Sequence, residues 1–321
     1  MATTEATKET ITRAAEILRA GGLVAFPTET VYGLGAIATN DRAVSRIFHA
    51  KGRPWQNPLI VHITDRSAAF PLAYWTDTAE VLADAFWPGP LTLVMTRKVS
   101  APISPLATAG LSTIALRVPA ATVARDLLQE VMLPVAAPSA NPSGRVSPTR
   151  AEHVNDGLGE EVDLILDGGP CSVGIESSVV DVSGETPKIL RVGGIPVAQI
   201  EELVGKVATR GETDAITSPG QLDSHYAPNA QLRLDADTVD GHEALLAFGP
   251  EPLPGAKLTR NLSAEGDLGQ AARDLFAHLR DLDAAGVESV AVMPIPNVGL
   301  GAAINDRLRR AAAPRSQPTA G

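Results

Sequence analysis

Residues 10–26 read TITRAAEILRAGGLVAF, an amphipathic helix followed by a short buried strand. Apolar residues recur at helical spacing, and the pair Gly21-Gly22 ends the helix. Residues 23–26 are a wholly apolar run of strand length. Helices and strands continue to follow one another along the chain, so this opening predicts an α/β fold with a mixed rather than strictly alternating sheet.

The pattern predicts one α/β domain over residues 1–205, with no internal repeat. Helices are expected at 10–20, 41–49 (capped by Asp41), 78–86, 121–131, 147–155 (opened by Ser147-Pro148) and 196–204. Strands are expected at 23–26, 59–63, 91–95, 114–118, 162–166, 178–182 and 188–192.

The remaining third of the chain predicts a second, smaller α/β domain over residues 230–313. Residues 206–229 have no clear period and are rich in turn formers, which predicts a linker. The second domain is expected to contain strands at 232–234, 244–248 and 290–294 and helices at 267–284 and 302–312. Residues 314–321 are expected to form a frayed tail.

Composition narrows the class of protein. The 321 residues are 44% hydrophobic and 20% charged, as in globular proteins. We find neither an apolar run long enough to span a membrane nor a secretory signal, and we expect a cytoplasmic protein with no membrane partner. Cys171 is the only cysteine, which excludes an internal disulfide and a cysteine-rich metal site.

The distribution of charge is more informative than its total. A net charge of −10 argues against nonspecific nucleic-acid binding as the main role. Segments 42–64, 85–125 and 131–151 nevertheless contain no acidic residue, although they contain several Arg and Lys. Although the whole chain is acidic, these segments contain basic residues and no Asp or Glu. This distribution predicts a local binding pocket for an anion.

Two short motifs identify the anion. Lys51-Gly52-Arg53-Pro54 and Ser139-Ala140-Asn141-Pro142 each carry two polar side chains two residues apart, and each ends on proline. Proline favours extended backbone in the residue before it, and side chains two apart on extended backbone point the same way. We therefore expect a cationic pair on one segment and a hydroxyl with an amide on the other. Together these groups suit a polyphosphate.

A wider set of motifs resembles the threonylcarbamoyl-AMP synthases in their long, two-domain form. In the first domain these motifs are Phe26-Pro27-Thr28-Glu29-Thr30-Val31-Tyr32-Gly33-Leu34-Gly35, Lys51-Gly52-Arg53-Pro54, Asn57-Pro58-Leu59, Ser139-Ala140-Asn141 and Glu176-Ser177-Ser178-Val179-Val180-Asp181. Later in the chain they are Ser218-Pro219-Gly220, His225-Tyr226-Ala227-Pro228 and Asn305-Asp306-Arg307-Leu308. The resemblance implies a YrdC-like catalytic domain on a twisted mixed sheet, plus a smaller Rossmann-like α/β domain.

The resemblance also implies the reaction. Members of the family condense L-threonine, bicarbonate (or CO2) and ATP with Mg2+, forming threonylcarbamoyl-AMP and pyrophosphate. The product then passes to the proteins that transfer the threonylcarbamoyl group to tRNA. No stable nucleic-acid binding is expected of this chain, and the sequence does not identify metal ligands.

The matched positions imply individual roles. ATP would be bound by Lys51, Arg53, Asn57, Thr113, Ser139, Asn141, Ser147, Arg191 and Tyr226, with Lys51 and Arg53 as the catalytic cations. Threonine would be bound by Thr30, His62, Arg117 and Ser177. The linker that carries Tyr226 would lie over the active site. Residues 221–224 depart from the family, which usually has basic and aromatic residues there, and this puts a cationic contribution of the linker in doubt.

Two other functions fit parts of the pattern. The cationic pocket could take an RNA backbone in a non-catalytic, ribosome-associated module, but the aromatic content of 4% offers few stacking platforms. A carbamoyl-transferring domain of a larger maturation enzyme is the third possibility. The zinc-finger and acylphosphatase-like companions of such an enzyme are not found in this sequence.

Overall fold

The computed structural model describes residues 3–209 and 226–314. The chain divides into two compact units, one comprising Met1–Ser143 and Pro148–Gln221, the other Gly144–Ser147 and Leu222–Gly321. Most of the predicted linker (210–225) and nearly all of the predicted tail (315–321) lie outside the described residues.

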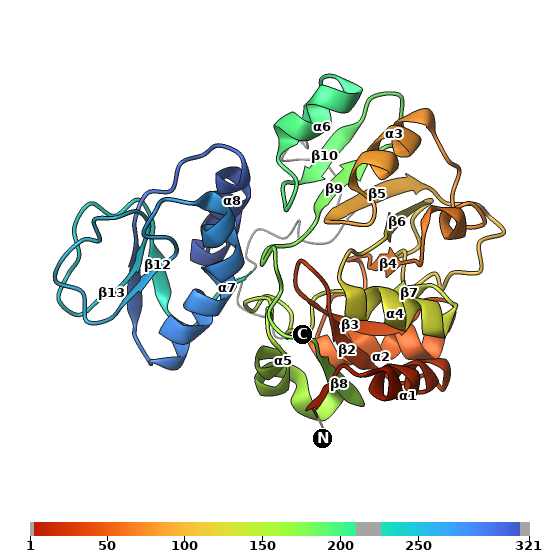
Figure 1. The fold of residues 1–321 in the computed structure, drawn as a ribbon, viewed down its shortest axis with the longest axis horizontal. Coiled ribbons are helices and arrows are strands. Elements are labelled where there is room, and N and C mark those ends of the chain that lie inside the picture. Colours follow the sequence, from red (N-terminus) through yellow and green to blue (C-terminus); the bar gives the residue numbers. More distant parts are fainter. Residues whose placement is uncertain (1–2, 210–225, 315–321) are drawn as a thin grey trace. The chain divides into compact units, whose positions relative to one another are not determined.

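The larger unit is built on one mixed sheet of 11 strands (Figure 1). The strands are β1 (Thr3–Glu5), β2 (Val24–Pro27), β3 (Tyr32–Ile37), β4 (Ile60–His62), β5 (Leu91–Thr96), β6 (Thr113–Arg117), β7 (Val135–Ala136), β8 (Leu164–Asp167), β9 (Ser178–Asp181), β10 (Lys188–Arg191) and β11 (Ala208–Thr209). Their order across the sheet is β1-β8-β2-β3-β7-β4-β6-β5-β9-β10-β11. Sequence neighbours such as β4 and β5 are separated by β6, so the motifs of distant segments are brought side by side.

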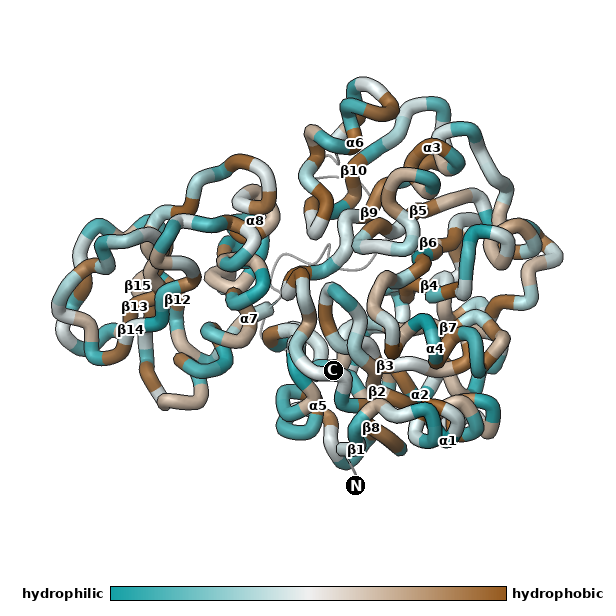
Figure 2. The backbone as a smooth tube through the Cα atoms, in the orientation of Figure 1, coloured by the Kyte–Doolittle hydropathy of each residue, from teal (hydrophilic) through white to brown (hydrophobic). Residues whose placement is uncertain are grey.

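Helices cover the two faces of this sheet unequally. They are α1 (Lys8–Arg19), α2 (Asp41–Lys51), α3 (Asp77–Phe86), α4 (Thr122–Val131), α5 (Ala151–Leu158) and α6 (Val197–Val204), with short 3-10 turns at Arg66–Ala69 and Gly159–Glu161. Buried side chains of α2, α3, α5 and α6 join the largest core cluster, on one face. Those of α1 and α4 pack on part of the other face. Figure 2 shows hydrophobic residues along strands such as β2 and β9 and hydrophilic ones on the outer turns of α1.

The rest of that second face carries a separate small cluster made only of strand residues. Its members are Ile60, Val94, Ala115, Val179 and Leu190. They come from β4, β5, β6, β9 and β10, which are adjacent in the sheet. All five are aliphatic, so this part of the face forms a small apolar floor. Polar residues of the same strands, such as His62 and Arg117, lie on the same face.

The smaller unit has a parallel sheet of four strands in the order β12-β15-β13-β14. Its elements are β12 (Gln231–Arg233), β13 (Ala244–Ala247), β14 (Thr259–Asn261), α7 (Leu268–Ala284), β15 (Ser289–Val292) and α8 (Leu300–Ala312). Helices α7 and α8 pack against each other. A large mixed sheet together with a small parallel sheet confirms the predicted fold class.

Most predicted elements are confirmed, but two helix starts are wrong. Asp41 does not cap α2, because the side chain of Asn40 accepts from the backbone N–H of Ala43 at 3.1 Å. Ser147-Pro148 does not open α5, which begins at Ala151. The carbonyl of Pro148 instead accepts from the N–H of Tyr32 at 2.8 Å, so it serves the sheet and not a helix.

Candidate functional site

The first cationic motif sits at the end of helix α2. Lys51 is its last residue, and Gly52 follows in the left-handed region with φ 58°. The N–H of Arg53 then returns to the carbonyl of Phe48 at 3.0 Å, which closes the helix end. The prediction that Lys51 and Arg53 lie on one extended segment is therefore wrong. Pro54 restricts the backbone of Arg53 only. Lys51 stays helical, because the left-handed conformation that ends the helix is taken by Gly52.

Lys51 joins the two motifs. Its Nζ donates to the carbonyl of Ser139 at 2.6 Å and also to the carbonyl of Asn141. The side chain is buried, and burial together with the neighbouring Arg53 holds the pKa of Lys51 well below its usual range. An incoming polyanion would favour the charged ammonium, so this position suits a phosphate chain.

Arg53 and Asn57 belong to one short loop. Arg53 Nε donates to the carbonyl of Asn57 at 3.2 Å, and its Nη2 donates to that of Pro58 at 2.9 Å. The Asn57 side chain is buried, yet neither its Nδ2 nor its Oδ1 has a hydrogen-bond partner among the described residues. Buried amides without partners are costly and uncommon, so Asn57 points to a ligand.

The predicted threonine residues gather on the sheet face that carries the small apolar floor. His62 of β4 pairs in register with Arg117 of β6. Thr113 lies on that face of β6 too, since residues two apart share a side. Ser177 precedes β9, and its hydroxyl meets that of Thr92 at 2.8 Å. Strands β4, β5 and β6 and the residue before β9 thus contribute polar side chains to one surface.

Arg191 completes this edge of the sheet. Its Nε and Nη2 donate to the carbonyl of Ser177 at 3.0 and 2.9 Å, and Nη2 also reaches the Ser177 hydroxyl at 3.0 Å. This approach depends on Gly193, because a Cβ there would stand 2.4 Å from the backbone carbon of Ser177. The predicted ATP residue Arg191 and the predicted threonine residue Ser177 are therefore in direct contact.

Thr30 lies in the tight connection between β2 and β3. Its hydroxyl meets that of Thr28 at 2.8 Å, and Thr28 also bonds to the backbone of Val31. Thr30 is completely buried. These hydrogen bonds of Thr28 and Thr30 hold the connection in one conformation. They thereby fix the backbone position of Glu29, which lies between the two threonines.

Glu29 is the site residue that our sequence reasoning missed. Its carboxylate forms a buried ion pair with Arg117, with Oε1 2.5 Å from Nη2. Burial alone would raise the pKa of Glu29, but Arg117 and backbone N–H donors outweigh it and hold the pKa below its usual value. A signal was present, because this acidic residue follows closely on the strand predicted at 23–26. Its partner Arg117 is 88 positions away, so no local pattern indicates the pairing.

His62 occupies an apolar setting beside this ion pair. Its ring meets the Phe26 ring edge-on, with centroids 6.3 Å apart. Burial, with the charge of Arg117 adding to it, lowers the pKa of His62 to about 3. His62 is therefore neutral near pH 7. Its Nδ1 is buried and finds no hydrogen-bond partner in the part of the chain that the structure describes.

Two predicted ATP residues, Ser147 and Tyr226, belong to the smaller unit. Tyr226 has a left-handed backbone, φ 64°, and only 1% of it is exposed. Its ring stacks on Phe276 with centroids 5.5 Å apart, and the guanidinium carbon of Arg307 lies 5.3 Å from its centroid. Ser147 is fully buried.

The described side chains do not form a site for a permanently bound metal ion. Within residues 3–209 and 226–314, no group of three or more His, Cys, Asp or Glu side chains could hold a metal ion. Mg2+ commonly keeps several waters and binds through substrate phosphates with one or two protein oxygens. The residues therefore fit a Mg2+ that arrives with a nucleotide, and the half-buried hydroxyl of Ser139 is an oxygen of the second motif that could contact it.

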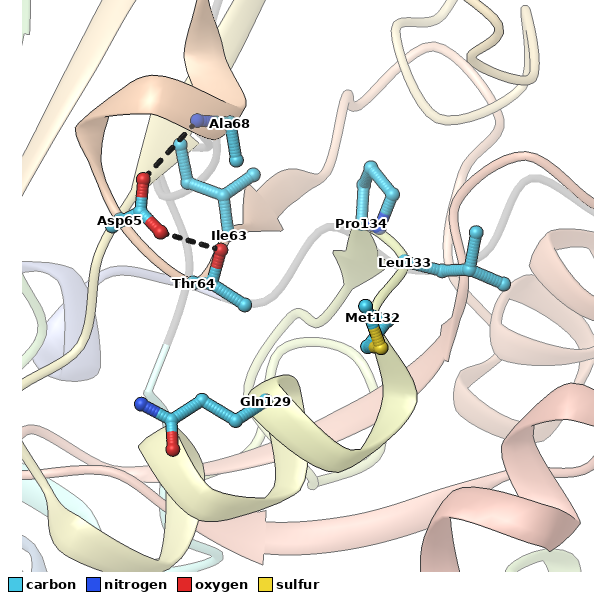
Figure 3. Close-up of a pocket in the computed structure, with 8 residues that line it drawn as sticks. All are labelled: Ile63, Thr64, Asp65, Ala68, Gln129, Met132, Leu133 and Pro134. Carbon is cyan, nitrogen blue, oxygen red and sulfur yellow. Dashed lines mark hydrogen bonds between the residues drawn. The ribbon is translucent and has the colours of Figure 1, made fainter.

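A pocket of about 320 Å³ lies elsewhere in the larger unit (Figure 3). It is lined by Ile63, Thr64, Asp65, Ala68, Gln129, Met132, Leu133 and Pro134. None of these is a predicted site residue, and the one ionisable lining group, Asp65, is an acid whose pKa is lowered by hydrogen bonds from Ser67. An acidic, largely apolar pocket does not suit a triphosphate. No described helix is long and apolar enough to cross a membrane.

Comparison with known proteins covers both units. A family model described as telomere recombination (Sua5/YciO/YrdC) matches residues 16–193, and one described as threonylcarbamoyl-AMP synthase, C-terminal domain, matches residues 195–313. The threonylcarbamoyl-AMP synthase of Pyrococcus abyssi is 41% identical over 93% of this chain and 92% of its own length. The threonylcarbamoyl-AMP synthase of Bacillus subtilis is 40% identical over 95% of this chain and 93% of its own length. The crystal structure of P. abyssi Sua5 complexed with L-threonine has a TM-score of 0.89 and 38% identity, covering 95% of both chains.

Proposed function

The chain belongs to the threonylcarbamoyl-AMP synthase family, and we propose that Lys51 and Arg53 hold ATP beside a threonine bound on the face of the large sheet. The observation that carries this proposal is the contact of Lys51 with the carbonyls of Ser139 and Asn141. That contact brings two separately predicted phosphate motifs to one place.

The ATP side of the proposal rests on charge and on donors. Arg53 offers a planar fork to two phosphate oxygens, and Lys51 offers a compact charge. Asn57 supplies the buried amide that has no described protein partner. The remaining proposed ATP contacts are Thr113, Ser139, Asn141, Ser147, Arg191 and Tyr226. Tyr226 would act from the proposed linker over the active site.

The threonine side rests on the sheet face. Arg117 would bind the carboxylate, and the Nδ1 of neutral His62 would accept a hydrogen bond from the substrate. Thr30 and Ser177 would add hydroxyl contacts. The P. abyssi relative crystallised with L-threonine supports this choice of substrate.

The reaction then needs positioning and charge, without a protein nucleophile. The threonine amine takes up CO2, supplied as CO2 or bicarbonate, and the resulting carbamate oxygen attacks the α-phosphorus of ATP in line as pyrophosphate leaves. Lys51 and Arg53 stabilise the negative charge that develops on the phosphates. Mg2+ bound with the nucleotide would supply further charge. The reaction would take place in the cytoplasm, where the product passes to the tRNA-modifying proteins.

The test is pyrophosphate release by the purified protein with ATP and Mg2+. Release that needs both L-threonine and bicarbonate supports the proposal, and release indifferent to threonine contradicts it. Arg53→Ala should lower kcat/KM by about 100-fold or more, by analogy with other charge-stabilising groups. Arg42→Ala is the matched control, because Arg42 lies in the same acid-free segment but is exposed. Equal activities of the two variants would remove Arg53 from the site.

The alternative of a non-catalytic RNA-binding module is not favoured. The relatives that match nearly the whole chain are named as synthases. An RNA affinity that falls steeply with salt, in a protein that releases no pyrophosphate, would restore it.

A further inference from the structure

The carboxylate of Glu29 ties three segments of the larger unit together. Its Oε1 meets Arg117, which ends β6. Its Oε2 accepts from the backbone N–H groups of Ala120 and Ala121, at 2.9 and 3.2 Å, directly before helix α4. Residue Ala121 has no side chain that could cap this helix, so Glu29 supplies the acceptor and the negative charge that a helix N-terminus favours.

The guanidinium of Arg117 is therefore held from two sides. Its Nη2 donates to Glu29, and its Nε donates to the carbonyl of Gly89 at 3.3 Å. The third nitrogen, Nη1, donates to no described residue. The planar group is thus fixed by two of its nitrogens, while one nitrogen stays available to a ligand.

We propose that Glu29 is a positioning residue for the amino-acid substrate, which orients Arg117 so that Nη1 meets the substrate carboxylate. This inference rests on the proposed function, because it assigns Arg117 to threonine binding. Glu29 itself does not touch the substrate or the reacting atoms.

Two physical effects of Glu29 oppose each other, and this makes the inference testable. As a charge, Glu29 cancels part of the attraction that Arg117 exerts on a carboxylate, so its removal as a charge alone would tighten threonine binding. As a hydrogen-bond partner, Glu29 already restricts Arg117 to one rotamer, so less side-chain entropy is lost when threonine binds. Removing this partner would therefore weaken threonine binding. We infer that this second effect dominates, because the Arg117 side chain is buried with only 4% exposed and depends on this partner.

The experiment compares Glu29→Gln with the unaltered protein. The glutamine can still accept from the Ala120 and Ala121 amides, but its charge and its strong acceptor for Arg117 are lost. The KM for L-threonine should rise about tenfold or more, while the KM for ATP and the kcat at saturating threonine change by less than about twofold. A lower threonine KM, or equal rises for both substrates, would overturn the proposal.

A matched control and a ligand comparison separate positioning from general damage. Glu243 also has a buried carboxylate 2.5 Å from an arginine, Arg233, and accepts from a backbone N–H, but it lies in the smaller unit. Glu243→Gln should cost stability without changing the KM for threonine. L-threoninamide lacks the carboxylate charge, so Glu29→Gln should weaken binding of L-threonine and leave that of L-threoninamide within about twofold.

Failure of the inference and failure of the proposed function give different results. If the unaltered protein shows no threonine-dependent pyrophosphate release, the proposed function fails first. If it does and Glu29→Gln retains the threonine KM, only the positioning role fails. Should Glu29→Gln not fold, Glu29→Asp serves, since one methylene fewer cannot span Arg117 and the helix N-terminus together. An unchanged threonine KM in Glu29→Asp would then overturn the proposal.

Discussion

Single residues of this site are defined by what surrounds them more than by their type. Lys51, Arg53 and Arg117 are all basic and all buried, but they do not share one kind of acceptor. Lys51 and Arg53 are held by backbone carbonyls, which carry no full charge, whereas Arg117 is held by a carboxylate. Carbonyl partners leave the charge of Arg53 uncompensated, whereas the carboxylate of Glu29 compensates that of Arg117.

His62 gives a prediction at this scale. Its pKa is about 3 in the folded protein against a usual 6.5, so the unfolded chain binds a proton that the folded one does not. The stability that His62 provides is complete above pH 6.5 and is lost as the pH falls toward 3. Between pH 7 and pH 5 the loss should be about 2 kcal/mol.

Urea unfolding at the two pH values measures this loss. His62→Gln has no group that titrates there, so its free energy of unfolding should fall by about 2 kcal/mol less than that of the unaltered protein over the same interval. Equal falls in the two proteins would mean that His62 titrates normally in the folded state.

At the scale of elements, the site depends on the close approach of β9 and β10. Arg191 of β10 holds the backbone and hydroxyl of Ser177, which precedes β9. The chain after β10 then passes so near that only a residue without a side chain fits at position 193. Local backbone packing therefore sets the distance between a proposed ATP residue and a proposed threonine residue.

Gly193→Ala should destabilise the protein by about 1–3 kcal/mol and raise the KM for threonine, since the new methyl group displaces Ser177. Gly184→Ala is the matched control, because Gly184 lies between the same two strands and a Cβ there meets nothing within 4 Å. It should change stability by less than about 0.5 kcal/mol. Thermal unfolding and threonine kinetics of both variants test this, and a Gly193→Ala protein that behaves like Gly184→Ala would contradict the packing argument.

At the scale of the whole molecule, each unit has its own sheet and its own core. Among the residues that the structure describes, the core clusters of the larger unit around Leu23, Val24 and Ile60 reach no further than Val207, and the last described strand of its sheet ends at Thr209. The smaller unit buries a separate cluster around Leu245 and Ala291. Burial of this kind is what lets a domain fold by itself.

A chain ending after Thr209 should therefore fold. All three tryptophans, Trp55, Trp75 and Trp87, lie in the larger unit, so their fluorescence reports its unfolding. The shortened chain should show one cooperative thermal transition in that signal. It should bind ATP more weakly, because it lacks Tyr226, a proposed ATP contact. A broad, non-cooperative transition would show that the larger unit needs the rest of the chain.

The sequence predicted the fold class and the main helices and strands, because those depend on local patterns: amphipathic periods for the helices and apolar runs for the strands. The roles of the site residues stay predictions, although the structure does bring Lys51 to the carbonyls of Ser139 and Asn141. The strands β1, β3, β7, β11 and β14 were not predicted, because they are short or interrupted by glycine and form through pairing with distant partners. The two helix starts failed for different reasons. The cap of α2 follows the local rule, because Asn40 accepts from the backbone N–H three residues on, but the prediction placed the cap one residue too late, at Asp41. Ser147-Pro148 opens no helix because Pro148 pairs with Tyr32, which is distant in sequence.

Local sequence patterns thus supply the proposed phosphate groups, which are two cations, a hydroxyl and an amide, and the family resemblance adds an arginine, a histidine and hydroxyls proposed for an amino acid. Only the folded chain sets which partners these groups meet. It placed Lys51 against the carbonyls of Ser139 and Asn141, and it set Glu29 against Arg117 across 88 positions of sequence. The physical reason is that side-chain type is a local property, whereas burial, hydrogen-bond partners and pKa depend on which distant strands the sheet makes neighbours.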